Sequence, residues 1–297
     1  MKTRIITGVS GALVAISLLV FMQYPCTIST VLAFFAALSV HEIMHVIGCK
    51  NKVITVIGMV FAGAACIFRD VYDYVIFHTQ STFFDTVHIP LWIVLAVYTM
   101  LIMVIMLKMY EKTRFQDAAM LIFASMGCGF GYSSLMWVRD IDHFFPNYFQ
   151  QSHGLFIVLI TLFSAWVSDT FAYFIGRKFG KHRLAPVISP KKSIEGAVAG
   201  VVGTELVSII AYFVANRYFD RFPDTLTVWK VAIGVFVAVV MGMCGDLSAS
   251  VIKRNFGAKD YGTFFPGHGG AMDRFDSYLF AMPSVAIMIA LVMNFVA

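Results

Sequence analysis

The sequence has few charged residues for its length. Asp, Glu, Lys and Arg make up 13% of its 297 residues, and hydrophobic residues make up 59%, whereas soluble domains carry roughly 25% charged residues. A soluble protein with a thick apolar core would still need a charged surface to stay in solution, so the composition excludes an ordinary soluble domain. The net charge of +5 is small for a nucleic-acid-binding protein, and we expect no nucleic acid partner.

The sequence also lacks the cysteine spacing of a zinc site or a disulfide framework. Its five cysteines lie in or beside apolar runs, and no two of them form a CxxC pair. Such cysteines are typical small, buried, apolar residues. Low-complexity segments and internal repeats are likewise absent, so we expect one helical membrane domain over residues 1–297.

What the sequence has instead is a series of long apolar runs. A transmembrane helix needs ~20 mostly apolar residues to cross a ~30 Å hydrocarbon core. The run 53–68 is the weakest, because it is short enough to be a tilted or partly buried element. The candidate runs are 5–24, 28–49, 53–68, 87–107, 117–138, 154–176, 195–215, 229–249 and 277–296. The sequence therefore predicts an all-α polytopic membrane protein with about nine transmembrane helices.

The first run raises the alternative of a cleaved signal peptide, since Lys2 and Arg4 precede it. It is long for the apolar region of a signal peptide, and no small-x-small cleavage site follows. We therefore expect a retained helix.

The distribution of Lys and Arg predicts the orientation of these helices. With nine spans, 17 of the 22 Lys and Arg residues fall on the side of the N-terminus and five on the other. Cytoplasmic loops carry an excess of positive charge, so the N-terminus and the basic loops 177–194 and 250–276 are expected in the cytoplasm. Polar residues concentrate in 151–297, which we expect to be the catalytic half, with 1–150 as a lipid-facing scaffold.

Ionisable residues inside apolar runs are functional candidates, because each costs roughly 2.5–3.5 kcal/mol at membrane depth. Asp169 and Asp246 are two such residues. Four polar residues at spacing i, i+4, i+7 and i+8 share one helical face: Asp246, Ser250, Lys253 and Arg254. The two cations alone are compatible with side chains that extend to the headgroups, but a stripe of mixed charge is less easily explained that way.

A glycine-rich segment with acidic residues follows this face. Gly267, Gly269 and Gly270 suit a loop that wraps an anionic ligand, although such glycines are also common in plain turns. Asp273 and Asp276, spaced i and i+3 at the start of the last helical run, are hard ligands of the kind that bind Mg²⁺. Helix N-capping is the alternative for one of these carboxylates.

The loop 177–194 carries the adjacent cations Lys191 and Lys192. They would meet substrate phosphates or, alternatively, anionic lipid headgroups. Ser189 or Ser193 can cap the helix that begins near Glu195.

The segment Ser250–Asp276, SVIKRNFGAKDYGTFFPGHGGAMDRFD, resembles the signature of the phosphatidate cytidylyltransferases, or CDP-diglyceride synthases. The shared pattern is S-x-apolar-KR, four residues, KD, then P-x-HGG, one apolar residue, any one residue, and DR-x-D. Ala271 stands where the family usually has a larger aliphatic residue. Asp169–Lys181 and Ser189–Gly196 also resemble family segments, with Ser193 where threonine is commoner. The resemblance runs from about residue 165 to the end of the chain.

The resemblance implies an enzyme that transfers CMP from CTP to phosphatidate and releases pyrophosphate. It implies Mg²⁺ on Asp246, Asp273 and Asp276, and leaves open a second cation, monovalent or divalent. The residues expected to be catalytic, by holding phosphate oxygens, are Lys253, Arg254, Lys259, His268 and Arg274. Those expected to bind substrate are Ser250, Lys191, Lys192, Gly269, Gly270 and Asp169. The implied location is a bacterial cytoplasmic membrane with the site facing the cytoplasm; the expected partners are CTP, phosphatidate, membrane lipid and a second copy in a homodimer.

Two alternatives come from other classes of protein. His41-Glu42-Ile43-Met44-His45 is an HExxH pattern, and two histidines at i and i+4 are the arrangement of intramembrane zinc proteases. Those enzymes need a third ligand in an NPDG-like turn, which the sequence lacks, so we expect these three residues to be polar helix-packing residues. An ion-coupled transporter would show inverted repeats or broken helices in both halves. A CTP-dependent lipid alcohol kinase would share the basic loops but not the full signature.

Overall fold

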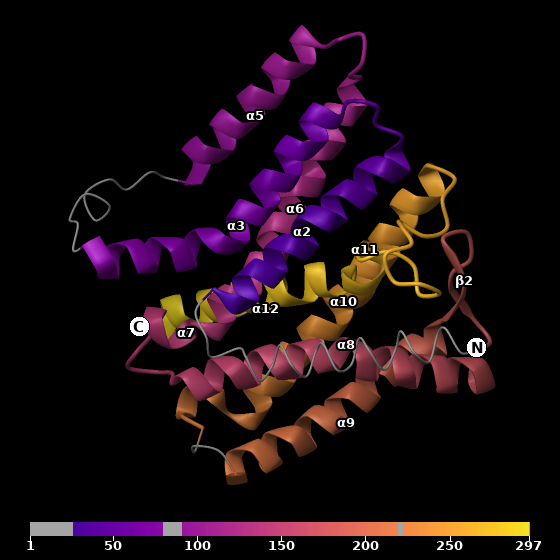
Figure 1. Cartoon of the computed structure of the whole chain (residues 1–297). Coiled ribbons are helices and arrows are strands. Elements are labelled where there is room, and N and C mark those ends of the chain that lie inside the picture. The colour runs from indigo at the N-terminus through magenta and orange to yellow at the C-terminus, as the bar shows by residue number, and fades with distance from the viewer. Residues whose placement is uncertain (1–25, 80–90, 219–221, 297) are drawn as a thin grey trace. The chain divides into compact units, whose positions relative to one another are not determined.

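The computed structural model describes residues 26–79, 91–218 and 222–296, and these residues are mainly helical, as predicted (Figure 1). The long helices are α2 (Thr27–Ile47), α3 (Lys52–Thr79), α5 (Leu91–Lys108), α6 (Phe115–Arg139), α8 (Gln151–Phe179), α9 (Ile194–Tyr218), α10 (Val228–Asn255) and α12 (Tyr278–Val296). The short elements are α7 (Ile141–Phe144), strands β1 (Arg183–Ala185) and β2 (Ser189–Ser193), the 3-10 helix η2 (Asp224–Leu226) and α11 (Met272–Phe275).

Six helices of the described part are long and apolar enough to cross a membrane: α2, α5, α6, α8, α9 and α10. The helices α3 and α12 contain shorter apolar stretches, Lys52–Phe68 and Tyr278–Asn294. Large apolar side chains such as Trp92 and Leu107 are exposed on α5, as expected for contact with lipid. The chain is therefore an integral membrane protein. The count of nine spans stays a prediction, because the run 5–24 lies outside the described residues.

The third predicted span ends too early, because α3 continues past residue 68 to Thr79. Within this continuation Asp70 is buried. Its carboxylate accepts hydrogen bonds from the Ser29 hydroxyl and the Cys26 backbone N–H, at the start of α2. Asp70, two residues beyond the predicted run, thus joins α3 to α2, and pairing reduces the cost of burying it.

The chain groups into two compact units. Unit 1 comprises residues 1–133 together with Asp260–Arg274, and unit 2 comprises 134–259 together with 275–297. The segment Asp260–Arg274, which carries the second half of the signature, thus packs with the N-terminal helices. The roles predicted for 1–150 and 151–297 stay predictions.

Within unit 1, α2 and α3 form a helical hairpin whose short connection makes them antiparallel neighbours. Small residues allow the helices to approach closely. A Cβ added at Gly129 of α6 would stand 3.2 Å from the Cβ of Ala65 and 3.3 Å from the Cα of Ala62, both on α3. Close approach of this kind is the usual basis of helix association in a membrane.

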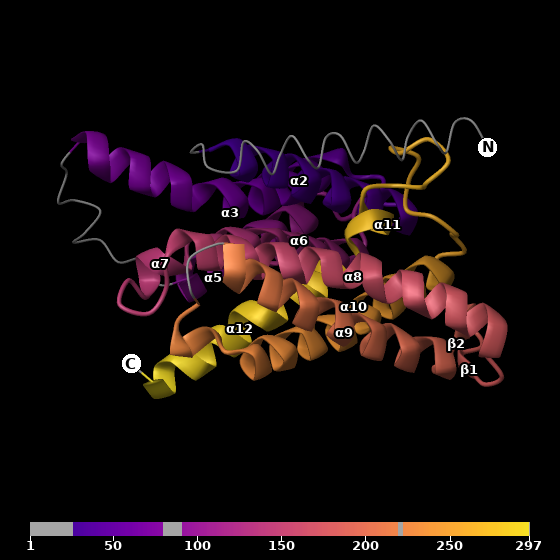
Figure 2. The same ribbon diagram turned by 90° about the horizontal axis from the view of Figure 1, so that it is seen from below.

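Within unit 2, α9 lies alongside α8 in both views (Figures 1 and 2). Three glycines of α9 lie at its contact with α8. An added Cβ would stand 2.8 Å from the Ala172 carbonyl at Gly196, 2.8 Å from the Ser168 hydroxyl at Gly200, and 2.4 Å from the Phe171 ring at Gly203. The helix α10 packs against α8, α9 and α12, so its polar face is surrounded by other helices of the same unit.

The loop between α8 and α9 contains an antiparallel hairpin that was not predicted. Strands β1 and β2 pair Arg183 with Ser193 and Ala185 with Ser189. The Ser193 hydroxyl then accepts a hydrogen bond from the Gly196 N–H at 3.1 Å, so the prediction that Ser193 caps this helix is confirmed. The segment SPKKS lacks the apolar alternation from which strands are usually predicted.

The close contact between the start of α8 and the end of α6 can be tested by substitution. A Cβ at Gly154, in the first turn of α8, would stand 2.3 Å from the Arg139 carbonyl oxygen and 2.8 Å from that of Val138. We expect Gly154→Ala to lower the free energy of unfolding by about 1–3 kcal/mol, because backbone must move to admit the methyl group. Gly127→Ala in α6 is the matched control, since nothing lies within 4 Å of its added Cβ. It should be neutral or stabilise by about 0.5–1 kcal/mol. Unfolding of both variants in detergent micelles gives the comparison, and equal stabilities would contradict it.

Candidate active site

The predicted polar face of α10 is present in unit 2. Asp246, Ser250 and Lys253 all lie on this one helix, as predicted. Ser250 and Lys253 are buried, with 9% and 7% of their surface exposed, so neither extends into solvent. Arg254 differs, because it is exposed and donates a hydrogen bond to the Ala258 carbonyl at 2.9 Å, just beyond the end of the helix. The face therefore presents a carboxylate, a hydroxyl and one cation.

Lys192 of β2 forms an ion pair with Asp246. Both side chains are partly buried, with 32% and 24% of their surface exposed. Burial lowers the pKa of Lys192, whereas the carboxylates of Asp169 and Asp276 raise it and the charge of Lys253 lowers it. One ammonium group is thus under the influence of three carboxylates, from α8, α10 and the segment before α12.

The base of the hairpin is packed tightly enough to define where Lys192 lies. The neighbouring residue Ser193 is buried, and three glycines surround its side chain. An added Cβ would stand 2.8 Å from the Ser193 hydroxyl at Gly176, 2.6 Å at Gly180 and 3.0 Å at Gly196. Any larger residue at these positions would push the hairpin away from the end of α8. Lys191, on the other side of Lys192, is exposed.

Asp276 is also held close to α10. It is buried, and its side chain accepts a hydrogen bond from the Ser277 N–H at 2.7 Å. A Cβ at Gly245 would stand 2.5 Å from the Asp276 carbonyl oxygen, so this glycine permits the close approach. The expectation that Asp273 and Asp276 open one continuous last helix is wrong, because α11 ends at Phe275 and α12 begins at Tyr278.

In unit 1 the glycine-rich segment forms a compact loop. Gly267 and Gly269 have φ of +79° and +91°, which other residues rarely adopt, and Phe265 pairs with Gly269 as an isolated bridge. The Asp273 carboxylate accepts hydrogen bonds from the backbone N–H groups of Tyr261 at 2.7 Å and Gly270 at 3.0 Å. Asp273 therefore reaches back to Gly270, two residues before its helix begins.

The remaining predicted residues of this segment differ in exposure. Lys259, next to the loop in sequence, and Arg274 are exposed cations. His268 is half-buried, and its Nδ1 is a buried atom without a hydrogen-bond partner in the described part of the chain. Gly270 is buried and Gly269 half-buried.

The residue that sequence reasoning missed is Glu42. It lies on α2 with 5% of its surface exposed, and its carboxylate accepts hydrogen bonds from the N–H groups of Ala271 at 3.0 Å and Met272 at 2.9 Å. The HExxH pattern had drawn attention to it, but as a zinc-protease base or a helix-packing residue. The signal available in the sequence was a carboxylate within an apolar run. Its hydrogen-bond partners could not be predicted, because they are backbone groups far away in sequence.

His41 and His45 are exposed on the same helix, with their rings stacked at 6.3 Å. No group of three or more His, Cys, Asp or Glu side chains able to hold a metal ion is found among residues 26–79, 91–218 and 222–296. In unit 2 the donor chemistry nevertheless suits Mg²⁺, since the carboxylates around the Lys192 ammonium are hard oxygen ligands. The ammonium now supplies the positive charge there.

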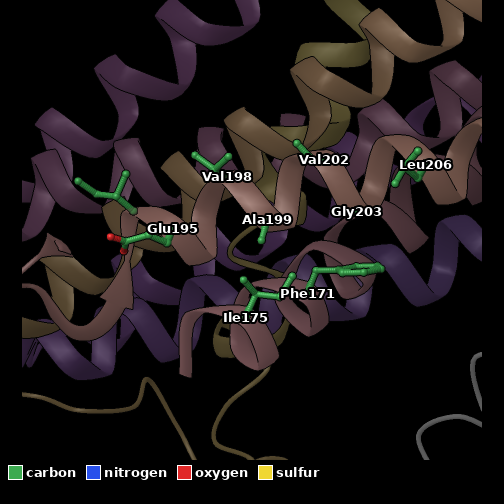
Figure 3. A pocket seen from close by; sticks show the side chains of 9 residues that line it. Phe171, Ile175, Glu195, Val198, Ala199, Val202, Gly203 and Leu206 are labelled. Carbon is green, nitrogen blue, oxygen red and sulfur yellow. The ribbon is translucent and has the colours of Figure 1, made fainter. Parts of the chain in front are cut away.

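An apolar groove of about 570 Å³ runs between α8 and α9 in unit 2. Figure 3 shows Phe171 and Ile175 of α8 opposite the side chains of α9, with Glu195 at one end of the row and Leu206 at the other. From Glu195 to Leu206 the helix rises ~17 Å at 1.5 Å per residue, close to the thickness of one leaflet, ~15 Å. The Glu195 end follows directly after the hairpin that carries Lys192.

Comparison with known proteins identifies the family. The model of the cytidylyltransferase family matches residues 2–292 of the chain. The chain belongs to the cytidylyltransferase family. The resemblance to the phosphatidate cytidylyltransferases seen in Ser250–Asp276 is confirmed, and neither alternative from the sequence, the zinc protease or the transporter, is supported.

Relatives of this chain carry the name phosphatidate cytidylyltransferase. The protein of Staphylococcus haemolyticus (strain JCSC1435) is 36% identical over 181 residues, which cover 60% of this chain and 62% of that protein. The protein of Staphylococcus aureus (strain COL) is 38% identical over 167 residues, or 56% and 61% of the two chains. The match thus spans less than two thirds of these staphylococcal relatives. The protein of Bacillus subtilis (strain 168) is 28% identical over 291 residues, which are 98% of each chain.

The Lys192–Asp246 pair can be tested through stability. Lys192→Met should lower the free energy of unfolding by about 1–3 kcal/mol, because the Asp246 carboxylate loses its partner in a partly buried place. Adding Asp246→Leu should restore most of the loss, since an apolar pair leaves no group unpaired. Lys191→Met, at the exposed neighbour, is the control and should change little. Denaturant unfolding in micelles measures the wild type and these three variants; a double variant no more stable than Lys192→Met would contradict the pairing.

Proposed function

We propose that this protein transfers the CMP moiety of CTP to phosphatidate, giving CDP-diacylglycerol and pyrophosphate in phospholipid biosynthesis. The observation that carries the proposal is the family match over residues 2–292, together with the B. subtilis relative named phosphatidate cytidylyltransferase, which aligns over 98% of both chains. The clustered carboxylates and cations of unit 2 agree with this chemistry, because phosphoryl-type transfer depends mainly on positioning and on stabilising negative charge.

In the reaction a phosphatidate oxygen attacks the α-phosphorus of CTP, and the bond to the pyrophosphate oxygen breaks. Phosphatidate is already an anion at neutral pH, so the attack needs no general base. We assign Lys253, Lys192 and Ser250 of unit 2 to contacts with phosphate oxygens. On substrate binding, the Lys192 ammonium group would move from the Asp246 carboxylate to the phosphates. The negative charge of the phosphates would then replace that of the carboxylate as its partner.

We assign the loop of unit 1 to the same phosphates. We assign Gly269 and Gly270 to the backbone of this phosphate-contacting loop, whose compact turn they permit. In the described part of the chain the buried Nδ1 of His268 has no hydrogen-bond partner, and Arg274 is an exposed cation. Lys191, Arg254 and Lys259 are exposed cations that would draw CTP or the lipid headgroup to the protein.

We further propose Mg²⁺ as the cofactor, bound by Asp246, Asp273 and Asp276, with Asp169 as a neighbouring carboxylate. When bound, Mg²⁺ would neutralise the charge of the phosphates. A second cation, monovalent or divalent, belongs to the same proposal.

The proposal places the protein in a bacterial cytoplasmic membrane with the basic loops facing the cytoplasm, where CTP is available. Phosphatidate would reach it from the lipid, and the apolar groove between α8 and α9 offers space for an acyl chain. A homodimer is part of the proposal as well.

The decisive experiment follows radiolabelled CTP. Detergent-purified protein, given phosphatidate and Mg²⁺, should convert the label to a lipid-extractable product, and chelation of Mg²⁺ should stop the conversion. Asp273→Ala should lower turnover on the order of 10²–10³-fold, as the loss of a charge-stabilising group does. Asp224→Ala, at an exposed aspartate of η2, is the control and should retain turnover.

The outcomes separate the parts of the proposal. Lipid product from the wild type that persists in Asp273→Ala would remove Asp273 from the site but leave the reaction. Absence of product from folded wild-type protein would overturn the reaction itself. Stoichiometric zinc in that inactive protein would then favour the HExxH reading at His41 and His45.

A further inference from the structure

The carboxylate of Glu42 is enclosed by the signature loop. Oε1 accepts the Ala271 N–H and Oε2 the Met272 N–H, at 3.0 and 2.9 Å. Both hydrogen bonds are buried and join α2 to a segment more than 200 residues away in sequence. A buried carboxylate is costly unless its hydrogen bonds are complete, so the loop and the helix residue depend on each other.

Two glycines make this enclosure possible by their lack of a side chain. A Cβ at Gly262 would stand 2.4 Å from Oε1 of Glu42, and one at Gly270 would stand 2.4 Å from Oε2. The positive φ values of the loop belong to Gly267 and Gly269. The requirement for glycine at 262 and 270 is therefore one of space, and the occupant of that space is the Glu42 carboxylate.

Successive amides of the loop are divided between two carboxylates. The Gly270 N–H donates to Asp273, and the next two N–H groups, of Ala271 and Met272, donate to Glu42. Asp273 also accepts the Tyr261 N–H. The backbone that orients Asp273 is thus the backbone that Glu42 holds, and a shift of residues 270–272 would turn the Asp273 carboxylate with it.

We infer that Glu42 is a positioning residue of the cytidylyltransferase reaction: it holds the backbone of residues 270–272 so that Asp273 presents its carboxylate in one orientation. The inference rests on the proposed function for its effect on catalysis, but the anchoring itself is a property of the folded chain. The hydrogen bonds that the structure shows for the Glu42 carboxylate come from backbone N–H groups, so we expect it to act through Asp273.

Amide hydrogen exchange tests the anchoring without any reaction. In Glu42→Gln one of the two N–H donors would face the amide NH₂ group of glutamine and lose its acceptor. Peptides that cover residues 261–276 should then exchange at least 10-fold faster than in the wild type, as followed by mass spectrometry in micelles. His45→Gln, an exposed residue one turn further along α2, should leave the exchange unchanged. Unaltered exchange in Glu42→Gln would overturn the inference, whatever the enzyme does.

Kinetics test the positioning role. The Mg²⁺ concentration for half-maximal activity should rise in Glu42→Gln, and turnover should fall about 10–100-fold, the usual effect of removing a group that orients a metal ligand. A partly unfolded sample would lower turnover but keep the half-saturating Mg²⁺ concentration of the remaining active molecules. Faster exchange with an unchanged Mg²⁺ dependence and turnover would overturn the positioning role. A wild type without turnover would instead defeat the proposed function, and the exchange result would still stand.

A double-mutant cycle provides the matched control for fold loss. Gly262→Ala alone should displace the carboxylate and reproduce the effects of Glu42→Gln. In a Glu42→Ala background the space is empty, so adding Gly262→Ala should lower turnover by less than 2-fold further. Independent effects of the two substitutions would contradict a direct contact, because residues that do not share an interaction combine additively.

Discussion

The pairing of polar groups inside apolar surroundings is the constraint on which this structure depends. Water is scarce between the helices of a membrane protein, so every buried donor, acceptor or charge needs a partner from the protein. Lys192 meets Asp246 on α10, Asp70 meets the first turn of α2, and Glu42 meets the backbone of the signature loop. Each pair joins segments that are distant in sequence, and each fixes the position of one polar element among helices that apolar contacts alone would locate only loosely.

The sequence was sufficient for the helices and for the family. Long apolar runs predicted each described helix that can cross a membrane, because length and hydropathy are local properties. The hydroxyl cap at Ser193 and the shared face of Asp246, Ser250 and Lys253 were also predictable, since both depend on helical spacing. Local spacing could not predict which polar groups contact each other. The pairing of Lys192 with Asp246 and the binding of loop amides by Glu42 both follow from tertiary packing. The hairpin β1–β2 was missed because its strands are short and polar.

The polar groups of the two units are held by different kinds of interaction. In unit 2 the carboxylates of Asp169, Asp246 and Asp276 act on Lys192, so charged side chains and not backbone groups make up its surroundings. In unit 1 carboxylates hold backbone amides, which cannot rearrange without remodelling the loop. In the proposed reaction both would contribute, because charged side chains can adapt to phosphates whose charge changes, while backbone hydrogen bonds keep a loop in one shape.

The register of strand β2 determines which way the Lys192 side chain points. Side chains alternate between the two faces of a strand, so a slip of one residue in the pairing with β1 would turn Lys192 to the opposite face and leave Asp246 without its cation. The buried Ser193, enclosed by glycines and capping α9, opposes such a slip, because a lysine or isoleucine would have to enter its space. The local electric field beside α10 is therefore set by the register of a short surface hairpin.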